Sequence, residues 1–251
     1  MILPASYSNG FAPRDGSPLY PELWRGCPFA FAACLGPSGS TLREWSGVNN
    51  HGTLVSIPET DWVISGSNYA LQFIAGTCYV QFGVIPTITR WTISAWINPT
   101  ATTGYLAIFG TPATGPASLY LLNGKIGVYT TADRFGAITV PTNAWSHVCV
   151  TGGDTIRIYV NGVADSTFSD SAAFGGTGNA RLGANAVSTS SELYKGLIDD
   201  LRVLSYQLSP REIRRLATRR GIAYELAPRR RSSSQVIAVF NRRRRLLLGA
   251  S

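Results

Sequence analysis

The adjacent aspartates Asp199 and Asp200 are the first residues to consider for catalysis, because pairs of carboxylates carry out glycoside hydrolysis. That reaction needs two carboxyl groups facing each other across a cleft, about 5 Å apart for retention and about 6.5–9.5 Å for inversion. These two aspartates lie in a strand-like run, where neighbouring side chains point to opposite faces. We therefore expect no cooperation: one should bond backbone groups near the following helix, and the other should be solvated.

General-base and nucleophilic chemistry has little support. The chain holds only two histidines, His51 in NNHGTL and His147 in AWSHVCVT, and we expect both to make structural hydrogen bonds within a turn or a strand. The nucleophile motif G-x-S-x-G and the phosphate-binding motif G-x-x-x-x-G-K-S/T are missing from the sequence. The sequence therefore predicts no catalytic residues and a protein that is not an enzyme.

The four cysteines show neither C-x-x-C spacing nor a nearby histidine pair, so a zinc site is not expected. No cofactor is predicted. The disulfide state is left open, with Cys27–Cys34 as the most local bridge, since a domain of this size needs no disulfide to be stable. Cys78 and Cys149 are expected to act as small core side chains.

Six tryptophans raise the question of a binding surface, because aromatic rings present large apolar faces to a ligand. Trp91, Trp96 and Trp145 lie in strand-like motifs and are expected in the core. Trp24, in PELWRG, and Trp62, in PETDWVISG, lie in segments that resemble loops. Since loops on a rigid scaffold commonly carry recognition, Trp24 and Trp62 are the candidate ligand-binding residues.

The basic charge is confined to the C-terminus. Residues 211–251 hold twelve Arg and two Glu (+10), whereas residues 1–210 hold ten Lys plus Arg and twelve Asp plus Glu (−2). Docking to an acidic protein partner is favoured over nucleic-acid binding, since no aromatic residues interleave the arginines, and over a merely solvated tail. The candidate partner-binding residues are Arg229, Arg230, Arg231, Arg242, Arg243, Arg244 and Arg245.

Short apolar runs between turn signals recur from about residue 27 to residue 205, which predicts an all-β body. Asn123-Gly124 and Asn161-Gly162 each join two such runs, and Asn-Gly suits the two-residue turn of an antiparallel hairpin. Ser209-Pro210-Arg211-Glu212 predicts a helix start with a capping box, and Gly221 could end that helix. The N-terminus lacks the pattern of a secretory signal, and no run is long enough for a membrane span, so we expect a soluble chain made inside a cell.

Five motifs in order resemble the laminin-G-like members of the concanavalin A-like lectin/glucanase superfamily. They are WSGVNNHGTL (45–54), WTISAWINP (91–99), AWSHVCVT (144–151), IRIYVNGV (156–163) and GLIDDLRVLSYQLSPREI (196–213). The resemblance covers roughly residues 30–217 and implies a jelly-roll sandwich of two antiparallel sheets. The resulting domain prediction is an N-terminal arm (1–29), the sandwich (30–208), a short packing helix (209–220) and the arginine-rich tail (221–251).

The chain departs from this family in two respects. Ala75-Gly76-Thr77-Cys78 stands where relatives usually carry acidic residues, so a calcium site is not supported and a sugar site dependent on those carboxylates is in doubt. The motif E-x-D-x-x-E of the hydrolase members is absent, which leaves a glycoside hydrolase as a remote alternative.

The segments flanking the sandwich are similar to uncharacterised proteins of bacteriophages and of some aquatic bacteria: FAPRDGSPLYPELWRG, CLGPSGSTLREWSG and FNRRRRLLLGAS. The leading hypothesis is a virion structural or decoration protein, anchored by its termini and homo-oligomeric, with other virion or assembly subunits as partners. The alternative is a glycan-binding lectin or adhesin module at the cell surface or outside the cell, exported by a non-classical route, with surface glycans as partners.

Overall fold

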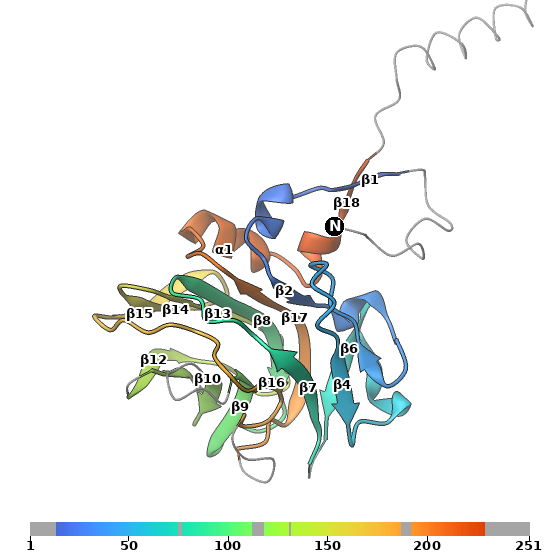
Figure 1. Ribbon diagram of the computed structural model, residues 1–251. Helices are drawn as coiled ribbons and strands as arrows, with labels where there is room; N and C mark the ends of the chain where they lie inside the picture. The colour runs from blue at the N-terminus through green and yellow to red at the C-terminus, as the bar shows by residue number, and fades with distance from the viewer. Residues whose placement is uncertain (1–13, 75–76, 112–117, 131, 187–191, 229–251) are drawn as a thin grey trace, which may run out of the picture.

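Two antiparallel sheets packed face to face make up the computed structural model, which describes residues 14–74, 77–111, 118–130, 132–186 and 192–228 (Figure 1). This architecture confirms the predicted all-β jelly-roll sandwich. Sheet I has the strand order β15 (Val163–Phe168), β14 (Ile156–Val160), β13 (Ser146–Gly152), β8 (Trp91–Pro99), β17 (Gly196–Leu204), β6 (Asn68–Phe73) and β5 (Trp62–Ser65), and β2 (Phe29–Phe31) also pairs with β17. Sheet II has the order β12 (Asp133–Thr139), β11 (Lys125–Tyr129), β10 (Ser118–Leu122), β9 (Tyr105–Gly110), β16 (Asn179–Leu182), β7 (Tyr79–Val84), β4 (Gly52–Val55) and β3 (Thr41–Leu42).

The period-two sequence pattern decides which side chains fill the space between the sheets. In β8, Trp91, Ile93 and Ile97 lie in the shared core, while the alternate residues Thr92 and Ser94 face the outer side of sheet I. Among the described residues, no helix is long and apolar enough to cross a membrane.

The two Asn-Gly turns are confirmed. Asn123 and Gly124 join β10 to β11 with φ values of 50° and 81°, and Asn161 and Gly162 join β14 to β15 with φ values of 51° and 77°. Positive φ at both central residues is what a type I′ hairpin requires, and Asn and Gly reach it most readily.

The helix α1 (Pro210–Leu216) starts as predicted, with Ser209 and Glu212 forming a complete capping box. It ends earlier than expected, because the Thr218 hydroxyl donates to the Arg215 carbonyl at 2.7 Å and satisfies the last turn. Gly221 (φ 73°) instead begins a separate 3-10 helix, η5 (Ile222–Tyr224). The helix therefore occupies only part of the predicted range 209–220.

The flanking segments cover the outer face of sheet I (Figure 1). A second apolar cluster forms there between sheet side chains such as Cys149 and Tyr159 and residues of η2 (Pro21–Trp24), α1 and η5. Leu23, Cys27 and Phe29 are buried, so residues 20–29 are part of the packed domain and not the extended arm that the sequence predicted. Two further short helices, η3 (Ala33–Leu35) and η4 (Glu59–Asp61), lie beside β6, and β1 (Arg14–Pro18) pairs with β18 (Leu226–Pro228) as a separate two-stranded ribbon.

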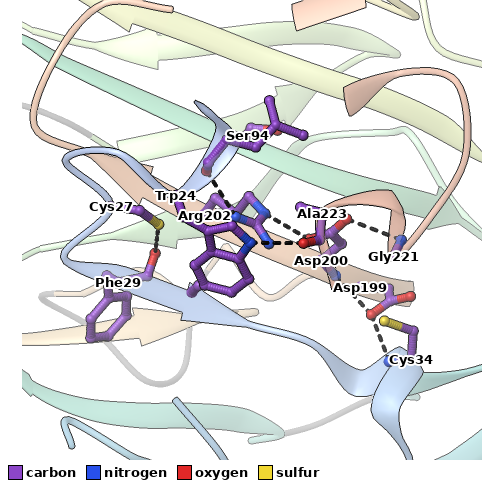
Figure 2. Close-up of polar contacts among 12 residues, drawn as sticks. Trp24, Cys27, Phe29, Cys34, Ser94, Asp199, Asp200, Arg202, Gly221 and Ala223 are labelled. Carbon is purple, nitrogen blue, oxygen red and sulfur yellow. Dashed lines mark hydrogen bonds and ion pairs between the residues drawn. The ribbon is translucent and has the colours of Figure 1, made fainter. Parts of the chain in front are cut away.

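A buried arginine holds these segments together (Figure 2). The guanidinium of Arg202, on β17, packs against the rings of both Trp24 and Tyr224, 4.4 and 4.6 Å from their centroids. Its Nε donates to Asp200 Oδ1 at 3.0 Å, and its Nη1 donates to the Leu23 carbonyl at 3.3 Å. Trp24 in turn donates to the Ala223 carbonyl at 2.7 Å, which connects the two flanking segments directly.

We predict that Arg202→Met lowers the free energy of unfolding by about 3–5 kcal/mol, because Asp200 is left as an unpaired buried charge. Urea denaturation at neutral pH measures the loss. Arg157→Met on β14 is the matched control and should change stability by less than about 0.5 kcal/mol. The double variant Asp200→Asn/Arg202→Met should recover part of the loss, and an Arg202→Met protein as stable as the control would contradict this account.

Candidate functional site

The carboxylate pair singled out in the sequence is structural. Asp199 and Asp200 are each only 2% exposed, so the prediction that one of them is solvated is wrong. A β-bulge between Asp199 and Arg202, with Asp200 at φ 47°, breaks the alternation that would place the two side chains on opposite faces. Both carboxylates reach the same turn: Asp199 Oδ2 lies 3.4 Å from Arg220 Nη1, and Asp200 Oδ2 accepts the Gly221 amide at 3.1 Å.

Asp199 is nevertheless electrostatically unusual. Burial, together with the adjacent Asp200, raises the pKa of Asp199 to about 7, although the Cys34 amide and Arg220 favour its charged form. The cavity that the pair lines is about 10 Å³, which has room for about one water molecule and not for a substrate. A separate polar pocket of about 330 Å³ is lined by their partners Cys34, Arg220 and Gly221, and neither aspartate lines it. The pair therefore offers no site for glycoside hydrolysis.

The raised pKa of Asp199 predicts a pH-dependent stability. The unfolded state loses this proton near pH 4 and the folded state near pH 7, so wild-type stability should fall by up to about 1.4 kcal/mol per pH unit between those values. Asp199→Asn should remove that slope, as measured by urea denaturation at several pH values. Asp154→Asn, at an exposed position, should leave the slope as it is, and equal slopes in wild type and Asp199→Asn would contradict the assignment.

His147 and Ser94 form a Ser–His pair on the outer face of sheet I, with His147 Nε2 2.8 Å from Ser94 Oγ. Both residues are buried, and burial lowers the pKa of His147 to about 3. Without solvent access the pair cannot exchange protons with a substrate. His51 accepts a hydrogen bond from the Glu44 amide at 3.0 Å, so both histidines make the structural contacts that the sequence predicted.

The cysteines form no disulfide in this structure, which answers the question that the sequence left open for Cys27 and Cys34. Cys149 is a buried core residue as predicted. Cys78 is partly buried against the main core. Within the described ranges, no group of three or more His, Cys, Asp or Glu side chains could hold a metal ion.

Of the two candidate ligand-binding tryptophans, Trp62 is buried, contrary to the prediction, and Trp24 is only partly exposed. Trp62 is only 6% exposed, because as the first residue of β5 it turns into the core between the sheets. Trp24 is half-buried and covers Arg202 with its ring, which also lies 5.2 Å from Tyr224. Their assignment as ligand-binding residues has lost its premise. Of the expected core tryptophans, Trp91 and Trp96 are buried, and Trp145 is half-buried with Arg220 over its ring.

Two groups of predicted residues lie outside the described part of the chain. One comprises Ala75 and Gly76, from the turn where relatives carry acidic residues. The other comprises the tail arginines Arg229, Arg230, Arg231, Arg242, Arg243, Arg244 and Arg245.

A cluster of two tyrosines and an aspartate lies instead on the outer face of sheet II, with Tyr105 and Asp133 exposed and Tyr120 only 4% exposed. Tyr120, on β10, donates its hydroxyl to Asp133 Oδ1 at 2.7 Å, and Tyr105, on β9, donates to Asp133 Oδ2 at 3.1 Å. The two tyrosine rings lie 5.4 Å apart. Tyr105 is 40% exposed, and Asp133 is exposed on the edge strand β12. We call Tyr105, Tyr120 and Asp133 the tyrosine–aspartate platform.

A glycine makes room for this platform. A Cβ at Gly127, on β11, would lie 2.4 Å from the Tyr120 ring, so only glycine allows the ring to lie flat across β11 towards Asp133. The Tyr120 ring also packs edge-on against Phe135. Burial and its hydrogen bond to Asp133 raise the pKa of Tyr120, and Tyr105's own hydrogen bond to Asp133 raises the pKa of Tyr105. Both hydroxyls therefore stay protonated donors at physiological pH.

A polar network continues from the platform across sheet II towards β16 and β7. Glu192, close enough to Tyr105 to raise its pKa, accepts a hydrogen bond from the Asn185 side-chain amide at 2.5 Å. Arg181, on β16, donates to the Asn185 carbonyl at 3.1 Å and lies 5.3 Å from the ring centre of Tyr79, on β7.

This arrangement can bind a polyhydroxylated ligand. Aromatic rings provide apolar surface, while carboxylate, amide and guanidinium groups bond hydroxyls, the usual combination in sites that orient small polar molecules. Sequence reasoning missed the platform because it considered tryptophan and overlooked tyrosine. The signal was present as Tyr105, Tyr120 and Gly127, at outward positions of strands whose other side chains are apolar.

The chain matches the family model described as the concanavalin A-like lectin/glucanases superfamily over residues 75–214. No curated protein sequence shows significant similarity to it. Similar solved structures include domain 4 of AbnA, a GH43 extracellular arabinanase from Geobacillus stearothermophilus, in complex with arabinotriose, with a TM-score of 0.61 and 18% identity over 76% of this chain and 98% of that one. The binding domain of Paraclostridial Mosquitocidal Protein 1 has a TM-score of 0.59 and 13% identity over 78% of this chain.

The ligand-binding domain of botulinum neurotoxin serotype D, in complex with N-acetylneuraminic acid, has a TM-score of 0.57 and 15% identity over 78% of this chain. The match covers 52% of each of the two toxin structures, so the present chain spans about half their length. At these identities the likeness concerns the fold alone.

Proposed function

Because the chain belongs to the concanavalin A-like lectin/glucanase superfamily, we propose that it is a non-catalytic carbohydrate-binding module whose ligand lies on the outer face of sheet II. The observation that carries this proposal is the tyrosine–aspartate platform, in which an exposed carboxylate is held between two tyrosine hydroxyls. Each Asp133 oxygen uses one lone pair for a tyrosine and keeps another for a sugar hydroxyl.

The burial of the other candidate groups supports a binding role over a catalytic one. Asp199 and Asp200 hold the fold together, and the Ser94–His147 pair has no access to solvent. On the open face, Asp133 is committed to two tyrosines and Glu192 to Asn185. Both carboxylates are therefore arranged to orient neighbouring groups.

Two of the similar structures contain saccharides, which favours the same ligand class here. The arabinanase domain was solved with arabinotriose and the neurotoxin domain with N-acetylneuraminic acid. We infer from this fold-level likeness that a glycan is the ligand class, and from the platform where on the chain it binds.

We predict that Tyr105→Ala and Asp133→Ala each weaken glycan binding about 10-fold or more, since a hydrogen bond to a charged group contributes about 1.5–3 kcal/mol. Glycan-array screening followed by calorimetry on the best ligand measures the effect. Tyr20→Ala, on the opposite side of the domain, is the matched control and should bind as wild type does. Unchanged affinity in both platform variants would place any glycan site elsewhere.

A structural or decoration role in a virus particle is the second candidate, and the ribbon of β1 and β18 favours it. The ribbon projects from the side of the domain that the flanking helices cover, away from the outer face of sheet II (Figure 1). The arginine-rich tail follows β18 directly in the sequence. Attachment through this side would leave the tyrosine–aspartate platform facing outwards, so the virion proposal and the glycan proposal are compatible.

We predict that the full chain co-sediments with purified particles of the source virus at physiological salt, and that residues 1–228 alone do not. A cut at residue 228 keeps the buried residues of η5, which a shorter truncation would remove. A full-length variant with the seven tail arginines changed to serine should behave like the truncation. Equal binding by all three proteins would contradict the anchor, and loss of binding after nuclease treatment would point to nucleic acid as the partner.

A further inference from the structure

A row of residues in register crosses sheet II at right angles to its strands. The strand pairings place these residues directly opposite one another, from β12 across to β4. In order they are Asp133, Tyr129, Ser118, Gly110, Arg181, Gln81 and Thr53. We call these residues the cross-strand row.

The cross-strand row lies on the outer face. Its sequence neighbours Leu119, Val80 and Leu182 are all in the core between the sheets, and side chains alternate along a strand. Tyr129 is 49% exposed, and Asp133 and Thr53 are exposed as well.

We propose that the cross-strand row binds an internal stretch of a linear, neutral polysaccharide, running across the strands and contacting several consecutive sugar units. This rests on the proposed function, of which it specifies the ligand class and the direction of binding. Six strand spacings of about 4.8 Å separate the two ends of the row, about 29 Å in all, far longer than a single sugar ring.

The side chains along the cross-strand row suit a long ligand better than a single sugar. Two residues with small side chains, Gly110 and Ser118, occupy its centre. Aromatic rings stand on both sides of this centre: Tyr129 with the tyrosine–aspartate platform on one side, and Tyr79 beside Arg181 on the other. The Gln81 side chain is partly exposed on β7, where its amide can reach a ligand at the far end of the row.

The charges on this face favour a neutral polymer. Asp133, at one end of the cross-strand row, is acidic, and Arg181, towards the other end, is basic, so the formal charges of the row sum to zero. A polymer of uniform charge would meet repulsion at one of these two residues.

Calorimetry with neutral linear oligosaccharides of one to six units tests the proposal, using cello-, manno-, xylo- and α-1,5-arabino-oligosaccharides as probes. Affinity should rise about 10-fold or more from the disaccharide to the hexasaccharide. Gln81→Ala should weaken hexasaccharide binding several-fold and leave disaccharide binding unchanged, because only the longer ligand reaches β7. Tyr105→Ala should weaken the binding of both.

The outcomes separate this proposal from the proposed function. Equal affinity for short and long oligosaccharides, or a hexasaccharide affinity unaffected by Gln81→Ala, overturns the cross-strand row while the platform stands. Absence of binding by wild type to every probe, or binding indifferent to Tyr105→Ala, overturns both. Ser118→Arg provides an independent check, since a large side chain at the centre should block the hexasaccharide and spare the disaccharide.

Discussion

The rest of the structure depends on the partners that stabilise one buried charge, that of Arg202. The guanidinium is fully buried, and transferring such an ion from water costs several kcal/mol unless partners surround it. Those partners come from three parts of the chain: Asp200 from the same strand, Trp24 from the N-terminal segment and Tyr224 from the C-terminal segment. Sheet I therefore needs both flanking segments in place, and the sandwich and its flanks form a single cooperative unit.

Because the flanking segments pack on sheet I to supply these partners, they cover its outer face and leave the outer face of sheet II uncovered. The polar side chains on the outer side of sheet I are used within the fold, with Thr92 donating to the Tyr206 carbonyl and Ser94 paired with His147. On sheet II, outward side chains such as Tyr105, Tyr129 and Asp133 are exposed, although Tyr120 is buried. The two sheets share a core and differ in what covers them, and the flanking segments leave the outer face of sheet II open.

The parts of this structure that depend on neighbouring residues could be predicted from the sequence. The turn at Asn161-Gly162 and the cap at Ser209 are local, since each depends on residues within three positions. The bulge beside Asp199 is a shift in the pairing of β17 with β8, and the sequence of neither strand alone predicts it. The same holds for the platform, because Tyr105 and Asp133 are 28 residues apart and meet only once four strands are in register. The packing of Trp24 on Arg202 could not be predicted for the same reason, since the two residues are far apart in the sequence.

The geometry also bears on how such a face would work. A row of side chains on an open sheet buries less of a ligand than a deep pocket does, so each copy should bind weakly on its own. Display of several copies raises the effective concentration of binding sites, and avidity can then exceed the affinity of a single site by about 10²–10⁴ without any new contact. Attachment through the ribbon of β1 and β18, on the side away from this face, would permit such display because it leaves the face unobstructed. Weak recognition by the open sheet, as we propose it, is therefore compatible with the display of several copies.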